Sequence, residues 1–277
     1  MPLSAIQISS IVISALEEDL LQGDVTTDNL PALNKKVSVA MNARQDMILS
    51  GAEVAEMVFK TVDATLSIEA PVANGIKCKK NDLIMTITGN FASILKAERT
   101  ALNFVQHCSG IATETNKYVS VIEGTNSKVT NTRKTTPGLR LIERQAVIDG
   151  GGSPHRYNLG SAVMLKDNHL AGVSITDAIR ELRSKIAHTQ TIEVEADNLD
   201  QVEEAAKAGA DIIMLDNMSP ATIEQALTLI NCRSKTEASG NINLDTIKTY
   251  ADTGVDYIST SKITLGAPAV DIGLDFI

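Results

Sequence analysis

The chain has 277 residues, of which 43% are hydrophobic, so it can bury a substantial core in one large domain or two. Its formal net charge of −9 argues against a nucleic-acid or membrane-surface role, because no sustained basic stripe appears. Three widely spaced cysteines suit neither a disulfide framework nor a zinc site, and we expect them to be small buried side chains. The sequence has no export signal and no apolar run of ~18 residues, so the cytoplasm is the expected location.

The first part of the chain mixes helical and strand-like segments. Apolar spacing predicts helices over 4–21 and 51–61, a turn at 23–27, a strand over 37–41 and two short strands within 66–88. A long helix is expected over 92–122, with a break or kink at Ser109-Gly110. His107 lies in this helix, where a lone histidine is usually a structural residue.

From residue 127 onward, strand-like and helical segments alternate. The expected strands are 127–132, 162–166, 191–195, 210–215, 234–238 and 256–259, and the expected helices are 176–187, 199–208, 220–230 and 244–253. Gly209 and Gly254 fit helix ends, and Ser219 before Pro220 fits a helix start. This alternation predicts parallel pairing through right-handed crossovers, and six units favour a closed or nearly closed barrel over an open sheet.

Positive charge is concentrated between residues 130 and 169. Six cationic residues and three acidic ones give this segment a net charge of +3 within an acidic chain. Arginine presents a planar fork of donors to carboxylates and phosphates, so the segment predicts a pocket for a small, highly anionic ligand. The alternative is an ordinary basic helix and loop on the surface.

Polar residues also stand at the end of each predicted strand in this half. They are Arg133-Lys134, Lys166 to His169, Glu195, Asp216-Asn217, Ser239-Gly240 and Ser259 to Ser261. In an α/β barrel these positions converge on one mouth, and cations with two carboxylates there suit a phosphorylated substrate with a divalent metal. Taken singly, Glu195 and Asp216 are explained equally well by strand-end solvation or helix capping.

The chain closely resembles the quinolinate phosphoribosyltransferase family, also called nicotinate-nucleotide pyrophosphorylase (carboxylating). The matching segments run in the same order along nearly the whole chain: GDVTT (23–27), ERTALNFVQHCSGIAT (98–113), TRKTTPGLR (132–140), GGGSPHR (150–156), KDNH (166–169), EVEADN (193–198), AGADIIMLDNMSP (208–220), EASGN (237–241) and TGVDYIS (253–259).

The resemblance implies a two-domain α/β fold. An N-terminal α/β sandwich domain over 1–105, joined by the C-terminal tail 266–277, would precede an incomplete TIM-like α/β barrel over 106–265. The resemblance also implies a homodimer in which the sandwich of one subunit covers the barrel mouth of the other, with a hexamer as the alternative assembly.

The resemblance also implies the chemistry and the residues that perform it. The implied enzyme is a pentosyltransferase that uses Mg²⁺ to join quinolinate and phosphoribosyl pyrophosphate, releasing nicotinate mononucleotide, pyrophosphate and CO₂ in de novo NAD biosynthesis. The implied catalytic residues are Lys134, Lys166, Glu195 and Asp216, with Glu195 and Asp216 also serving the metal. The implied substrate-binding residues are Arg99 from the neighbouring subunit, Thr132, Arg133, Lys134, His155, Arg156, Lys166, Glu195, Asp216, Ser239, Gly240, Asn241, Thr260, Ser261 and Lys262.

Five residues at three places depart from the usual family pattern. Pro154 replaces a common Asn, Gly160 replaces a common Asp, and Thr260-Ser261-Lys262 replaces a frequent Val-Gly-Ala. These departures keep open a paralogous phosphoribosyltransferase of the molybdenum-transport-associated type, which would act on another anionic heterocycle. A catalytically silent anion-binding protein is a third reading, but it would require the loss of a carboxylate or cation that this chain retains.

Overall fold

The computed structural model describes residues 3–277, which divide into two compact units. The first unit comprises the chain up to residue 116 together with 135–151 and 263–277, and the second comprises 117–134 and 152–262. Compared with the predicted ranges 1–105 and 106–265, the first unit also includes 106–116, 135–151 and 263–265, and 135–151 lies in sequence between two parts of the second unit.

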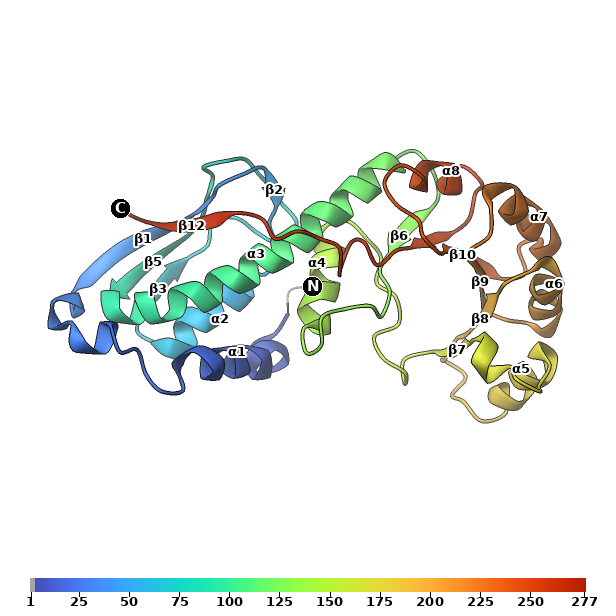
Figure 1. Cartoon of the computed structure of the whole chain (residues 1–277), viewed down its shortest axis with the longest axis horizontal. Coiled ribbons are helices and arrows are strands. Elements are labelled where there is room, and N and C mark those ends of the chain that lie inside the picture. The colour runs from blue at the N-terminus through green and yellow to red at the C-terminus, as the bar shows by residue number, and fades with distance from the viewer. Residues whose placement is uncertain (1–2) are drawn as a thin grey trace. The chain divides into compact units, whose positions relative to one another are not determined.

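The first unit is built on an antiparallel sheet with strand order β12-β1-β5-β3. The C-terminal strand β12 pairs with β1, so the two ends of the sequence share this sheet (Figure 1). Its helices and strands are α1 (Ala5–Leu20), η1 (Thr27–Asn29), η2 (Pro31–Leu33), β1 (Lys36–Ala43), β2 (Met47–Ile48), α2 (Ala52–Val62), β3 (Ser67–Glu69), β4 (Lys77–Cys78), β5 (Leu83–Asn90), most of α3 (Phe91–Val121), α4 (Arg140–Asp149) and β12 (Ile272–Phe276). The predicted helices over 4–21 and 51–61 and the strand over 37–41 are confirmed within a few residues. The segment 66–88 contains parts of three strands rather than two, and β2, α4 and β12 were not assigned from the sequence.

Helix α3 runs without interruption through Ser109 and Gly110, so the predicted break is wrong. Ser109 is fully buried, and its hydroxyl bonds the backbone of Ser50 as acceptor at 3.0 Å and as donor at 3.1 Å. A Cβ atom at Gly110 would lie 2.2 Å from the carbonyl oxygen of Pro268. The two residues therefore serve close packing around the helix, a requirement that helical propensity does not reveal.

The second unit contains a parallel sheet with strand order β6-β11-β10-β9-β8-β7. Its strands are β6 (Lys128–Thr130), β7 (Val163–Leu165), β8 (Ile192–Ala196), β9 (Ile212–Asp216), β10 (Lys235–Ser239) and β11 (Tyr257–Ser259). Its helices are η3 (Asp167–His169), α5 (Ile175–Arg183), α6 (Leu199–Ala208), α7 (Pro220–Ile230) and α8 (Ile247–Ala251).

All six predicted strands and four predicted helices of this half are present, with shifts of a few residues at their ends. The curved sheet has β6 and β7 at its edges, so it forms an incomplete α/β barrel, with α5, α6 and α7 along its outer side (Figure 1). The predicted cap is confirmed, because the Ser219 hydroxyl accepts a hydrogen bond from the N–H of Thr222 and Pro220 begins α7.

Among the described residues, no helix is long and apolar enough to cross a bilayer. All three cysteines are free thiols. Cys78 and Cys108 are buried as expected, whereas Cys232 is exposed, which corrects the prediction for that residue.

Candidate active site

A cavity of about 700 Å³ opens at the carboxyl ends of the strands of the second unit. Parallel strands bring the residues that follow them to one edge of a sheet, and in α/β barrels this is the face where ligands bind. The cavity is lined by Thr132, Arg133, Lys134, His155, Arg156, Met164, Lys166, Glu195, Met214, Asp216, Asn217, Glu237, Ser239, Gly240, Asn241, Ile242, Ser259, Thr260, Ser261 and Lys262.

Side chains near the carboxyl ends of the strands form two layers, because alternate residues of a strand point to the same face. The outer layer holds polar groups at the strand ends, among them Glu195, Asp216 and Ser239. Two residues earlier on the same three strands stand Glu193, Met214 and Glu237, which form the inner layer. The pairing register staggers the strands: Glu195 lies opposite Met214, Met214 lies opposite Glu237, and Asp216 lies opposite Ser239. Each layer is therefore defined by position along its own strand.

Charged groups of the outer layer are concentrated between β7 and β9. The Lys166 ammonium forms an ion pair with Glu195, whose side chain is only 16% exposed. Burial raises the pKa of Asp216 above its ordinary value, and the negative charges of Glu195 and Asp197 raise it further. Three neighbouring carboxylates against one lysine leave an excess of negative charge at this edge, which a cation bound here would relieve.

Two loops face each other on another side of the cavity. Gly240 has a φ of +105°, and a Cβ atom there would lie 2.2 Å from Asn217 Oδ1 and 2.9 Å from the Asn217 backbone nitrogen. The Thr260 hydroxyl donates a hydrogen bond of 3.0 Å to the carbonyl oxygen of Ile242, which ties the loop after β11 to the loop after β10. Glycine is therefore required at 240 for both its backbone conformation and its close approach to Asn217.

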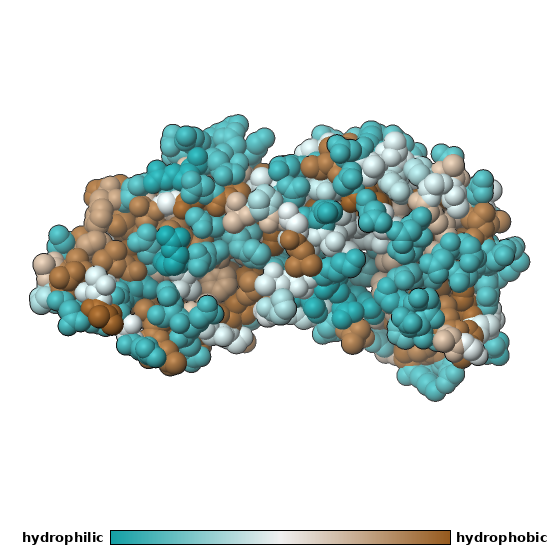
Figure 2. Space-filling model, in the orientation of Figure 1, coloured by the Kyte–Doolittle hydropathy of each residue, from teal (hydrophilic) through white to brown (hydrophobic). Residues whose placement is uncertain are grey.

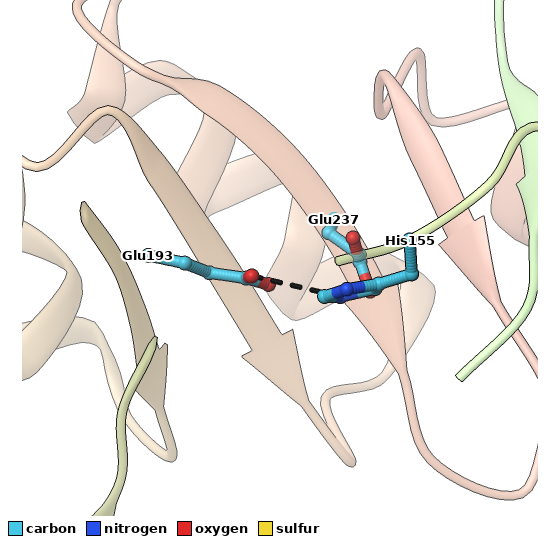
Figure 3. A group of neighbouring side chains, drawn as sticks. All are labelled: His155, Glu193 and Glu237. Carbon is cyan, nitrogen blue, oxygen red and sulfur yellow. Dashed lines mark ion pairs between the residues drawn. The ribbon is translucent and has the colours of Figure 1, made fainter. Parts of the chain in front are cut away.

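The inner layer contains a cluster of three ionisable side chains, His155, Glu193 and Glu237 (Figure 3). His155 Nε2 lies 3.5 Å from one oxygen of each carboxylate, and the glutamates are only 2% and 4% exposed. Burial alone would lower the pKa of His155, but the two carboxylates outweigh it and raise that pKa to about 10. Burial raises the pKa of Glu193, because His155 only partly compensates for its desolvation and for the charge of Glu237.

All substrate-binding residues implied by the sequence line this cavity except Arg99, which lies exposed on α3 in the first unit. Of the segment 166–169, only Lys166 reaches the cavity, while His169 Nδ1 accepts a hydrogen bond from the backbone of Lys166. His107 is also outside the cavity, and its Nε2 lies 2.9 Å from the buried carboxylate of Glu143, consistent with its expected structural role.

Sequence reasoning identified His155 but missed Glu193 and Glu237. These two residues lie within strands, whereas the candidate polar residues were sought at strand ends. The signal was present in the alternating segment Glu193-Val194-Glu195, because a period of two places both acids on the same face of the strand.

Comparisons with known proteins agree with this geometry. The family model for the quinolinate phosphoribosyl transferase C-terminal domain matches residues 111–275, and the model for the N-terminal domain of the same family matches residues 24–109. The chain belongs to the quinolinate phosphoribosyl transferase family.

Relatives within the quinolinate phosphoribosyl transferase family match over most of their length. The chain is 38% identical to the probable nicotinate-nucleotide pyrophosphorylase (carboxylating) of Synechocystis over 266 residues, which covers 95% of this chain and 90% of the relative. It is 37% identical to the corresponding Mycobacterium leprae protein, with 94% of each covered. The crystal structure of NadC from Streptococcus pyogenes superimposes with a TM-score of 0.94 at 41% identity, covering 100% of this chain and 99% of that one.

Proposed function

We propose that this chain transfers the phosphoribosyl group of phosphoribosyl pyrophosphate to quinolinate and decarboxylates the product. The products are nicotinate mononucleotide, pyrophosphate and CO₂, as in de novo NAD biosynthesis. The observation that carries the proposal is the cavity of the second unit, which combines cationic side chains, a carboxylate pair and two facing loops. Such a cavity matches a planar dicarboxylic acid and a ribose that carries phosphate at both ends.

The cationic part of the cavity fits quinolinate. Arg133, Arg156 and Lys166 line it together with His155 and supply several donors for two carboxylates. Arg156 is held in place by a hydrogen bond of 3.0 Å from its guanidinium to the carbonyl oxygen of Ala162. A fixed set of cations favours an acid with two adjacent carboxylates over one with a single carboxylate, so it supports quinolinate over nicotinate.

The reaction consists of two bond exchanges. The pyridine nitrogen of quinolinate forms a bond to C1 of the ribose while the bond from C1 to the pyrophosphate oxygen breaks. Lys134 and Lys166 stabilise the negative charge that develops on pyrophosphate. The bond between the ring and the 2-carboxylate then breaks, its electron pair stays on the ring beside the positively charged nitrogen, and a proton from water replaces the CO₂ that leaves.

Glu195 and Asp216 are the residues that would hold Mg²⁺. The residues fit the ion, because the raised pKa of Asp216 and the excess of carboxylates at this edge mark a place where a cation is favourable. Mg²⁺ bound there supplies charge neutralisation for pyrophosphate. The two carboxylates also accept hydrogen bonds from the ribose hydroxyls in this proposal.

The two facing loops fit the 5′-phosphate. Ser239, Gly240 and Asn241 on one side and Thr260, Ser261 and Lys262 on the other line the cavity. The positive φ angles of Gly240 and Asn241 bring successive backbone N–H groups into a turn that suits an anion. Lys262 adds a positive charge beside these backbone donors.

We also propose that the active enzyme is a cytoplasmic homodimer in which Arg99 of one copy completes the cavity of the other. The first unit exposes Ile6, Ile13, Leu21, Val25 and Leu30, and Figure 2 shows apolar residues gathered on the surface of this unit. Exposed apolar groups concentrated in one region are typical of an interaction surface, which supports association through this unit.

The paralogous phosphoribosyltransferase is less well supported. The relatives that match nearly the full chain carry the name nicotinate-nucleotide pyrophosphorylase (carboxylating). Pro154 lies next to the cavity residue His155, and Gly160 is exposed in the following loop, so neither removes a cationic group from the cavity.

The proposed function is tested by measuring nicotinate mononucleotide formed from phosphoribosyl pyrophosphate with quinolinate or nicotinate, each with Mg²⁺ or with EDTA. We expect turnover of quinolinate only, and only with the metal. A folded protein that binds phosphoribosyl pyrophosphate but converts neither acid would overturn the proposal and favour the paralogous reading. Turnover in EDTA would overturn the metal assignment alone.

The shared site is tested by mixing two inactive variants. Arg99→Ala and Lys166→Ala remove groups that belong to the same cavity but come from different copies in this proposal. A heterodimer of the two variants contains one cavity with both groups intact, so we expect partial recovery of activity, up to about half per dimer. No recovery in a heterodimer verified by tagging and mass measurement would contradict the shared site.

A further inference from the structure

Two buried carboxylates lie directly below the cationic part of the cavity. Glu193 of β8 and Glu237 of β10 flank β9 and reach His155 from two sides (Figure 3). Oxygen Oε1 of Glu193 accepts no hydrogen bond from any residue of the range 3–277. Two incompletely paired carboxylates below an anion site are costly for stability, so their presence calls for a role in that site.

The two ring nitrogens of His155 face different partners. Nitrogen Nδ1 lies 2.7 Å from the backbone nitrogen of Arg156, so Nε2 is the ring nitrogen that faces the carboxylates. Nε2 faces Glu193 and Glu237, and the backbone N–H of His155 donates to the buried side chain of Asn131 at 2.9 Å. The ring orientation is therefore set by contacts within the protein.

The charge of Glu193 also acts on Arg156. Burial and the neighbouring charge of Arg133 lower the pKa of Arg156, while the charge of Glu193 acts in the opposite direction. Nitrogen Nε of Arg156 is buried and has no hydrogen-bond partner within residues 3–277. Glu193 therefore offsets the repulsion between two arginines that must lie close together to bind two carboxylates of one ligand.

Direct contact of either glutamate with the substrates is unfavourable. Glu193 does not line the cavity, and Glu237 would present a negative charge to an anionic ligand. We propose that Glu193 and Glu237 are positioning residues that orient His155, and that Glu193 also balances the charge of Arg156, so that the cavity is preorganised for a dicarboxylate before it binds. This inference rests on the proposed function, because it assigns the two residues to the quinolinate side of the cavity.

The test is Glu237→Gln and Glu193→Gln, which keep the side-chain shape and remove the charge. We expect the KM for quinolinate to rise about tenfold in each variant, because His155 is then less firmly held in its binding orientation. The KM for phosphoribosyl pyrophosphate and kcat should stay within about twofold, because their residues lie in the outer layer. Glu237→Asp keeps the charge and should recover part of the loss.

A double-mutant cycle separates positioning from direct binding. In a His155→Ala background, Glu237→Gln should have no further effect on the KM for quinolinate, because the group it acts through is gone. Additive losses would mean that Glu237 contacts the ligand itself and would overturn the inference. Glu143→Gln is the matched control, since it removes another buried glutamate paired with a histidine and should leave both KM values unchanged.

Further outcomes would also overturn the inference. An unchanged quinolinate KM in both glutamine variants would do so, and so would equal losses in kcat and both KM values. Because the three side chains could also ligate a cation, metal content is measured after dialysis against EDTA. If the wild type retains one ion per chain and Glu237→Gln does not, the three side chains bind a metal and the positioning role is wrong. Absence of quinolinate turnover in the wild type would instead refute the proposed function, so the two failures are distinguishable.

Discussion

Among residues 3–277, two groups place a histidine against buried glutamates, and they are built differently. In the first unit, the Glu143 carboxylate lies 2.9 Å from His107 Nε2 and accepts a hydrogen bond of 3.2 Å from the backbone N–H of Thr136. In the second unit, one histidine lies 3.5 Å from each of two carboxylates, and Oε1 of Glu193 lacks a hydrogen-bond partner among the described residues. The first group is well satisfied and the second is not.

The pKa shifts express this difference. Burial opposes ionisation of Glu143, but hydrogen bonds from His107 and Thr136 outweigh it and lower the pKa of that carboxyl. For Glu193 burial prevails and its pKa is raised. A satisfied buried charge stabilises the fold, whereas an incompletely satisfied one is retained for another reason, and the adjoining cavity indicates that the reason is ligand binding.

The largest effect is expected from the outer layer of the cavity. Lys166→Ala removes a cation that faces the reacting groups, so kcat/KM for quinolinate should fall on the order of 100-fold or more. Its side chain is 40% exposed, so the unfolding midpoint in urea should hardly move. Lys185→Ala, which breaks an exposed pair with Glu181, is the control and should affect neither quantity. Activity within a few fold of wild type would contradict the assignment of Lys166.

Loss of the contact between Glu143 and His107 should reduce stability and leave activity unchanged. Glu143→Gln keeps the shape but removes the charge that accepts two hydrogen bonds, so the free energy of unfolding should decrease by about 1–3 kcal/mol. Urea denaturation measures the change, and steady-state kinetics at a temperature well below the midpoint should show retained activity. A stable but inactive variant would place Glu143 in the catalytic machinery and remove the contrast.

A smaller effect on stability is expected from Glu193→Gln. Because the folded state raises the pKa of Glu193, its ionisation at neutral pH is unfavourable to folding, and removing the charge relieves that penalty. The free energy of unfolding should change by less than about 1 kcal/mol or increase. A loss as large as that of Glu143→Gln would show that both clusters are equally structural.

The pH dependence of the unfolding free energy tests the lowered pKa of Glu143. A carboxyl whose pKa is lowered on folding contributes stability that is present above its ordinary pKa of 4.5 and is lost as the pH falls through the folded value. The difference in unfolding free energy between wild type and Glu143→Gln should therefore be constant from pH 7 to about 5 and shrink below 4.5. Parallel stability curves throughout that range would contradict the lowered pKa.

Much of the second unit follows from the sequence because its signals are local. Alternating apolar segments predicted the strands and helices, and Ser219 with Pro220 marked the start of α7. The carboxyl ends of parallel strands must share an edge, so polar residues at those ends were expected to meet, and they line one cavity. The incomplete barrel implied by the family resemblance is confirmed, but the local pattern could not distinguish a closed from a nearly closed barrel, because closure depends on whether β6 and β7 pair.

The sequence by itself determined the family, the order of elements and the outer layer of polar residues, since these depend on periodicity, end signals and motifs. Only the tertiary structure decided that Glu193 and Glu237 meet at His155, because residues separated by about forty positions come together through strand order. The tertiary structure also decided that α3 is continuous and that the backbone of Pro268 packs closely against Gly110. Contacts between distant segments fix burial, and burial fixes whether a charge stabilises the fold or prepares a site.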